Sequence, residues 1–346
     1  MKNKLTYFIA RSSMFGIGFF LIFQNVGKDA WISILLGTLL GVIVLYVYNL
    51  IKKQLNNNTL ENNLKSNFLG IIYNIIFIIF YLYLISAMLM LLPIFVNSFY
   101  LTTTPKIIIN IPFLLLAIFI TFKGPKVIEN LSNFLCVFSV IIILFFAFSL
   151  NNYIEFSNLY PILTNETFSI IKCALIYASI TSIPQILTIN YDNDFKNTIK
   201  DYLLSSLTLF VIVFFTIVSL GEPLLKIYSF PEYTVLRQIK ILNFIENIEN
   251  ISSFIWYFDM FIMLSILTNN LKHALPKKYN LIYFYTLLLI VLLFASYFVG
   301  DNYINILNLA YYYPFVLFFF FIIFITLLIY LKFKINPQKN ITQTNV

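Results

Sequence analysis

The chain has 346 residues, of which 60% are hydrophobic and 10% charged, and its formal net charge is +8. No soluble domain carries so much apolar surface, so the composition excludes a soluble globular protein and predicts a polytopic membrane protein. The basic residues are scattered over short loops between apolar segments, which excludes a nucleic-acid-binding protein. Both cysteines, Cys136 and Cys173, lie in apolar runs, so we expect neither a disulfide framework nor a metal site.

Ten apolar runs follow one another, each near the roughly 20 residues that a transmembrane helix requires. They predict an all-α membrane protein in which residues 1–346 form a single polytopic domain. The first run has no small-residue cleavage site and leads directly into the second, so we expect it to be a transmembrane helix rather than a signal peptide. The ten runs are residues 6–23, 30–51, 68–97, 105–122, 127–150, 167–189, 202–221, 251–271, 281–299 and 304–331.

The positions of Lys and Arg predict the orientation in the membrane. With the N-terminus inside, sixteen of the 22 basic residues, Arg11 among them, fall at cytoplasmic ends and loops, and five fall outside. This excess predicts a multi-pass protein with both termini in the cytoplasm. Residues 221–250 would form an external loop, partly helical because apolar residues recur at helical spacing from Val235 to Ile245. The tail, residues 336–346, is predicted to be disordered.

The first apolar run contains two glycines, Gly16 and Gly18, near its middle. Each costs a helix roughly 1 kcal/mol relative to alanine. An interrupted backbone at mid-membrane is tolerated only where it is buried in protein or lines a cavity, and such interruptions indicate substrate sites in transporters. The alternative is that the glycines only allow another helix to pack closely.

The sixth run contains a second candidate break, where Ser179, Thr181 and Ser182 precede Pro184. Proline removes a backbone hydrogen bond and clashes with the preceding turn, so we expect the helix to kink or open just before it. The alternative is an ordinary proline kink. The two breaks fall in runs one and six, the first runs of two five-helix halves of opposite direction. This arrangement predicts inverted repeats, residues 1–150 and 151–346, in a leucine-transporter-like 5+5 fold with helices 1 and 6 broken.

Helix N-termini at the two breaks would offer unpaired amides to a carboxylate, and glycine lets the ligand approach the backbone. We therefore predict a site for a small zwitterionic amino acid, enclosed by aromatic side chains, with Tyr83 as a further candidate. The predicted ligand-binding residues are Gly16, Ile17, Gly18, Phe19, Tyr177, Ala178, Ser179, Thr181, Ser182, Tyr81 and Asp259.

Asp259 is the one acidic residue deep in a predicted span. A charge there costs at least a few kcal/mol, so we expect it to face the bundle interior and to be paired or protonated. It would couple a proton or cation or contact a ligand amine; alternatively, it holds helices together, and Lys172 is one candidate partner. The sequence contains no set of catalytic residues and no phosphate-binding loop, so we expect no enzyme activity and no cofactor.

Six segments of the chain carry a resemblance to a known family: residues 27–37 (GKDAWISILLG), Thr104-Pro105, Gly124, residues 158–161 (NLYP), Phe230-Pro231 and Ile255-Trp256. They resemble the B subunit of spore germinant receptors, the endospore germination permease family of the amino acid–polyamine–organocation superfamily. Where that family usually has an acidic-Arg-x-acidic stretch, this chain has Asn247 in place of Arg.

The resemblance implies a nutrient-sensing subunit in the spore inner membrane that works with germinant receptor A and C subunits. A free-standing amino acid or amine permease, coupled to protons or cations, is the alternative, because a sensor derived from a transporter keeps the same site. The residues alone do not separate the two.

Overall fold

The computed structural model of the protein describes residues 3–55, 60, 64, 68–191, 193–238, 249–276, 280–298 and 303–335. Every regular element in these residues is helical, as the composition predicts. The α-helices are α1 (Leu5–Ser12), α2 (Phe19–Val26), α3 (Ala30–Gln54), α5 (Phe68–Phe99), α6 (Lys106–Lys123), α7 (Pro125–Ser149), α8 (Thr167–Ser182), α9 (Phe195–Ile227), α10 (Pro231–Thr234), α11 (Glu249–Ala274), α12 (Asn280–Leu293) and α13 (Tyr303–Ile335).

Eight segments of the described chain are long and apolar enough to cross a membrane, which makes the protein a multi-pass membrane protein. The first segment, Leu5–Gln54, has 50 residues and is divided by a short 3₁₀ turn at Gly27–Asp29. Leu281–Tyr297 forms a shorter apolar helix. The all-α prediction is confirmed, whereas the ten-helix 5+5 arrangement stays a prediction.

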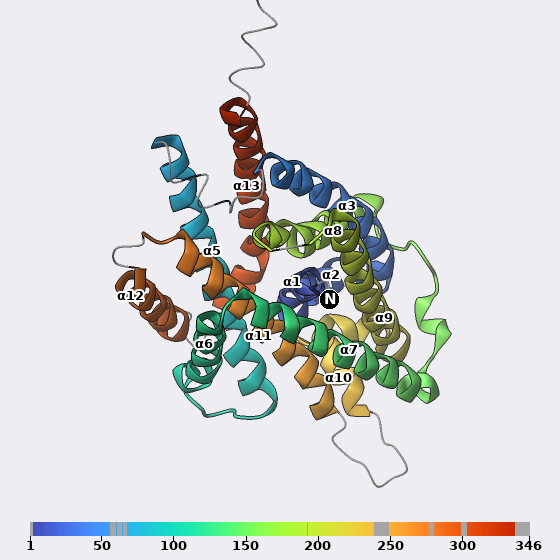
Figure 1. Ribbon diagram of the computed structural model, residues 1–346. Coiled ribbons are helices and arrows are strands. Elements are labelled where there is room, and N and C mark those ends of the chain that lie inside the picture. The colour runs from blue at the N-terminus through green and yellow to red at the C-terminus, as the bar shows by residue number, and fades with distance from the viewer. Residues whose placement is uncertain are drawn as a thin grey trace, which may run out of the picture.

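Helix α1 lies at the centre of the bundle, where α7, α8, α9 and α11 pack around it (Figure 1). Every residue of Leu5–Ser12 is buried, so this helix has no surface toward lipid. Helix α3 runs along α8 and α9, and α11 packs against α5 and α6. The outer helices α3, α6, α7 and α13 carry the exposed apolar side chains that lipid would cover, among them Leu39, Leu115, Phe134 and Phe319.

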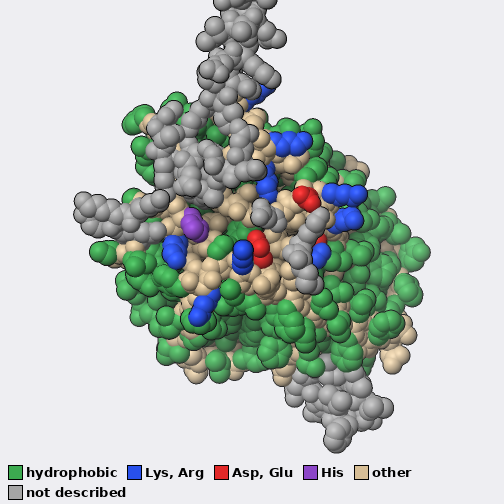
Figure 2. Space-filling model, viewed as in Figure 1, with side chains coloured by type: hydrophobic (Ala, Val, Ile, Leu, Met, Phe, Trp, Pro, Cys, Tyr) green, Lys and Arg blue, Asp and Glu red, His purple; other side chains and the backbone are tan. Residues whose placement is uncertain are grey.

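Polar side chains gather at one end of the bundle. Figure 2 shows basic and acidic side chains and the single histidine, His273, on one face, surrounded by hydrophobic side chains. Helix α3 ends near this region with Lys52, whose Nζ donates to the carbonyl oxygens of Tyr191 and Asn193 at 2.7 and 3.0 Å.

Asp29 fastens the start of α3 to the segment that precedes α8. Its buried carboxylate accepts hydrogen bonds from the backbone N–H groups of Leu163 at 3.0 Å and Asn165 at 3.1 Å. The Asn165 side-chain amide donates to the same carboxylate at 2.8 Å. Charge-assisted bonds of this kind are roughly twice as strong as neutral ones. The Gly-Lys-Asp segment therefore joins the two halves of the sequence at one point.

The loop after the seventh predicted span is partly helical. Helix α9 continues to Ile227 across a kink at Gly221 (φ 70°, ψ 164°), and α10 is followed by a 3₁₀ turn, Val235–Gln238. The prediction of helical structure is therefore confirmed for residues 235–238, and the helix begins earlier, at Pro231. Residues 239–248, which include Asn247, and the predicted disordered tail, residues 336–346, lie outside the described residues.

Candidate functional site

The first membrane helix is broken where the glycines predict it. Phe15 (φ −67°, ψ 128°) is extended and Gly16 (φ 82°, ψ −43°) is left-handed, so the backbone leaves the helix for these two residues. Only Gly16 needs the freedom of glycine, because Gly18 (φ −65°, ψ −50°) is already helical and begins the continuation into α2. The broken segment packs against α8, so it lies beside the sixth predicted span.

Side chains occupy the space around both glycines. A Cβ atom on Gly16 would lie 3.1 Å from the ring of Phe230, and one on Gly18 would lie 2.5 Å from the Met14 sulfur. Gly16 therefore supports a close approach of the external loop, whereas Gly18 makes room for a side chain of its own helix. Close packing and a helix break, the two readings of this motif, occur together here.

The second predicted break has a different form. Helix α8 ends at Ser182 and continues as a 3₁₀ helix, Ile183–Thr188, with Pro184 in its first turn. Ser182 (φ −107°, ψ −32°) and Ile183 (φ −63°, ψ −42°) both stay right-handed. The backbone tightens from an α-helix to a 3₁₀ helix and does not lose its helical conformation. Pro184 is tolerated because a proline in the first turn of a helix loses no intrahelical hydrogen bond. The expected opening before Pro184 is therefore corrected to a change of helix type.

The hydroxyl groups of α8 bond to carbonyl oxygens of their own helix. Ser179 donates to Ile176 and Thr181 to Tyr177, both at 2.8 Å, and Ser182 donates to Ala178. The 3₁₀ segment reaches the central helix through Gln185, whose Nε2 donates to Thr6 O at 3.0 Å and to Thr181 O at 3.1 Å.

A buried ion pair ties the central helix to α11. Arg11 Nε lies 3.1 and 3.3 Å from the two carboxylate oxygens of Asp259, and both side chains are 0% exposed. Arg11 Nη1 also donates to Tyr7 Oη and Thr208 Oγ1, each at 2.8 Å. Arg11, and not the candidate Lys172, is therefore the partner of Asp259, and Lys172 is exposed. The counting of Arg11 among cytoplasmic charges is wrong, because the side chain is wholly inside the bundle.

The remaining predicted ligand residues are all buried. Tyr177 is buried where α8 meets Gly37 of α3. Phe19 stacks edge-on against Phe15 at 5.3 Å between ring centroids. Ile17 is buried at the break and Ala178 in α8. Tyr81 is buried in α5 beside Phe77.

Tyr83 connects α5 to the break. Its ring stacks on Tyr313 of α13 at 5.8 Å between ring centroids. The hydroxyl group of Tyr313 lies 2.8 Å from Ser13 Oγ, directly before the broken segment. Tyr83 therefore reaches the break through α13.

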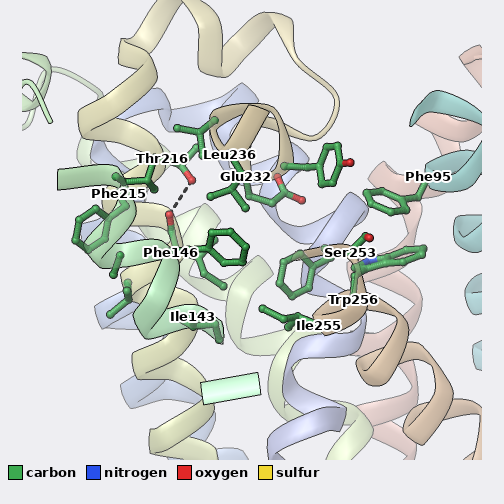
Figure 3. A pocket seen from close by; sticks show the side chains of 17 residues that line it. Phe95, Ile143, Phe146, Phe215, Thr216, Glu232, Leu236, Ser253, Ile255 and Trp256 are labelled. Atoms are coloured by element: carbon green, nitrogen blue, oxygen red, sulfur yellow. Dashed lines mark hydrogen bonds between the residues drawn. The ribbon is translucent and has the colours of Figure 1, made fainter. Parts of the chain in front are cut away.

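A partly open cavity lies next to the break, with an empty volume of about 640 Å³. Figure 3 shows Phe95 and Trp256 on one side of it and Phe146 and Phe215 on the other, with the Glu232 carboxyl group between them. Most of the walls come from α7, α9, α10 and α11, with Phe95 from α5, Phe15 from the broken segment, and Val235 and Leu236 from the 3₁₀ turn after α10. None of the eleven predicted ligand residues lines this cavity, although Phe15, the neighbour of Gly16, does.

Glu232 is the acidic residue of this cavity, and the sequence reasoning missed it. Glu232 is 6% exposed, and the backbone N–H of Gly16 donates to its carboxylate. Burial raises the pKa of Glu232 to about 8, although the amide hydrogen bonds lower it. Oε2 has no hydrogen-bond partner among the described residues. Only its position after Pro231 marks Glu232 in the sequence, and that position gives no sign of burial.

The fold and this site define a helical multi-pass membrane protein whose central helix is broken beside an aromatic cavity. Residues 2–277 match the spore permease family, described as spore germination protein, and the chain belongs to that family. Family membership confirms the resemblance inferred from the sequence motifs. This family comprises proteins of the transporter or receptor type and is not an enzyme family. The chain is also 26% identical over 242 residues to the putative spore germination protein YfkT of Bacillus subtilis (strain 168), covering 68% of this chain and 67% of that protein.

Proposed function

We propose that the protein is the nutrient-sensing subunit of a spore germination receptor in the spore inner membrane. In this role it binds a small amino acid between the break in helix 1 and the point where α8 becomes a 3₁₀ helix, and it works with receptor A and C subunits. The observation that carries the proposal is the break at Phe15 and Gly16 in the central helix of a spore germination family member. A free-standing amino acid or amine permease, coupled to protons or cations, is the second candidate.

The proposed architecture has ten helices in two inverted halves, residues 1–150 and 151–346. Counting Leu5–Gln54 as two crossings and Leu281–Tyr297 as one raises the eight segments to ten. The helix contacts support this division, because each of two contacts has a counterpart in which both helices are replaced by the corresponding helices of the other half. Contact of α1 with α9 corresponds to contact of α8 with α3, and contact of α7 with α9 corresponds to contact of α13 with α3.

Both termini are proposed to lie in the cytoplasm, and the charged face of Figure 2 is proposed to face it. The excess of Lys and Arg in the predicted cytoplasmic loops supports this orientation. A Lys53→Cys variant, at an exposed residue near the end of α3, tests it in sealed cells with a membrane-impermeant thiol reagent, after replacement of both native cysteines by serine. No labelling is expected until the membrane is permeabilised. Labelling from outside would reverse the topology.

Ligand binding in this proposal shifts a conformational equilibrium that the partner subunits read. The Phe230 ring fills the space over Gly16, and the α8 hydroxyl groups bond to their own helix. A carboxylate at the break would therefore displace Phe230 from Gly16. This displacement gives the ligand a differential interaction with two states, which a sensor requires.

The test of the ligand site is the germination dose response of Gly18→Val and Ser182→Val variants. Valine crowds the broken segment, so we expect at least a tenfold weaker response at normal protein abundance. Ser149→Val is the matched control, because Ser149 also donates to a carbonyl of the preceding turn, Phe145 O at 2.9 Å, but lies at the end of α7. Unchanged responses in both site variants would mean that the ligand binds elsewhere.

Gene deletion separates the two candidate functions. A sensor predicts loss of germination in at least one nutrient, with uptake of amino acids unchanged. If germination were normal in all nutrients while uptake of one amino acid was abolished, the protein would be a permease.

A further inference from the structure

The cavity beside the helix break carries an unused buried carboxyl oxygen. Glu232 is held between the Gly16 amide and the cavity, and its Oε2 has no partner among the described residues. A buried carboxylate oxygen without a partner disfavours the ionised form of the group. A positively charged donor beside Oε2 would favour the ionised form and would satisfy both its lone pairs and its charge.

The described residues supply no such cation to the cavity. Glu232 is the only charged residue among the seventeen lining residues. Arg11, which lies near Phe15, is already committed to Asp259 in the ion pair described above. The hydroxyl groups of Thr216 and Ser253 donate to backbone oxygens of Ile212 and Asn250, at 2.7 and 2.6 Å. A cation that pairs with Glu232 must therefore come from outside the described chain.

Aromatic rings form much of the remaining wall. Phe95 and Trp256 pack with ring centroids 4.5 Å apart, and Phe15, Phe146, Phe215 and Tyr233 also line the cavity. Aromatic faces attract organic cations as well as apolar groups, and binding pockets for small molecules typically span about 300–1,000 Å³. The lining suits a small molecule with one charged end and an apolar body.

We propose that this cavity binds a small primary amine with an apolar body, whose ammonium group donates to Glu232 and whose body packs among Phe95, Phe146 and Trp256. A zwitterionic amino acid fits less well, because the lining has no positive charge for its carboxylate. The free donor at Trp256 Nε1 is neutral and does not balance that charge. The site adjoins the proposed amino acid site at the break, because Glu232 contacts Gly16 and Phe15 lines the cavity, and the proposal rests on neither sensing nor transport.

The experiment uses Trp256 as a reporter in the purified full chain, reconstituted in nanodiscs. The sequence has two tryptophans, so a Trp31→Phe background leaves Trp256 alone. Benzylamine is the charged probe and benzyl alcohol its neutral counterpart, both tested at pH 7.5. We expect a saturable change in Trp256 emission with benzylamine. The affinity for benzyl alcohol should be at least tenfold weaker, and Glu232→Gln should weaken benzylamine binding at least tenfold. Glu166→Gln, at an exposed residue before α8 without a side-chain capping bond, should leave the affinity unchanged.

Three results would overturn the proposal: no saturable emission change, equal affinity for the two probes, or unchanged benzylamine affinity in the Glu232→Gln variant. A thermal shift of the unmodified protein, larger with benzylamine than with benzyl alcohol, checks the same preference without any substitution. Equal shifts would also overturn it. Neither readout involves germination or uptake, so failure here leaves the proposed function standing, and the reverse holds as well.

Discussion

Removing one partner of the Arg11–Asp259 ion pair should lower the free energy of unfolding of the protein. Both side chains are 0% exposed, and the Asp259 oxygens accept from Arg11 Nε at 3.1 and 3.3 Å. Asp259→Ala leaves a buried guanidinium whose remaining acceptors, Tyr7 and Thr208, are neutral. Breaking a buried pair in this way costs about 3–5 kcal/mol of unfolding free energy.

The double variant Arg11→Met with Asp259→Leu removes both charges and fills the space with apolar side chains. Its unfolding free energy should lie within about 2 kcal/mol of the parent, because no uncompensated charge remains. Reversible unfolding in mixed micelles measures all three proteins. Lys226→Met is the control, since it breaks a partly exposed pair with Glu222 one helical turn away, worth about 0.5 kcal/mol. A double variant as unstable as Asp259→Ala, or an Asp259→Ala variant as stable as the control, would refute the reasoning.

Three further predictions concern stability, each measured by thermal unfolding in detergent. Gly16→Ala should destabilise by about 1–3 kcal/mol, since its φ is 82° and the new Cβ meets Phe230; a change within error would contradict the strained break. Asp29→Ala should cost about 1–3 kcal/mol and expose residues 163–165 to proteolysis, because their amides lose an acceptor; unchanged cleavage would argue against the fastening. Burial raises the pKa of Glu232 from 4.5 to about 8, so its protonated form stabilises the fold. That contribution is complete below about pH 4.5 and falls by up to about 1.4 kcal/mol per pH unit as the pH rises to 8. Glu232→Gln should remove this slope, and a slope that persists would assign the effect to another group.

Features that depend on local backbone chemistry could be predicted from the sequence. Gly16 adopts a positive φ that other residues rarely tolerate, so its place in an apolar run marks the break directly. Pro184 marks the end of α8 correctly, but not its form, because proline also fits the first turn of a 3₁₀ helix.

Features that depend on distant partners could not be predicted. Arg11 lies near the cytoplasmic end of an apolar run, and charge counting treats every such residue as a topology signal. Asp259 is recognisable as an expensive intramembrane charge, yet nothing near it in the sequence identifies Arg11 as its partner. Glu232 resembles any acidic loop residue, since its helix α10 is packed by α9 and α11 and its carboxylate is contacted by Gly16, none of which its own segment of sequence reveals.

The ion pair at the bundle centre has a consequence for synthesis of the protein. Arg11 and Asp259 are 248 residues apart, so the arginine enters the bilayer long before its carboxylate partner exists. At about 5–20 residues per second, the interval is roughly 10–50 s. During that time the first helix holds a charge that costs at least about 2.5 kcal/mol at the centre of an isolated span. The amino-terminal helix is thus less stable in the membrane until Asp259 has been synthesised. Chains truncated before Asp259 should be early substrates for membrane quality-control proteases.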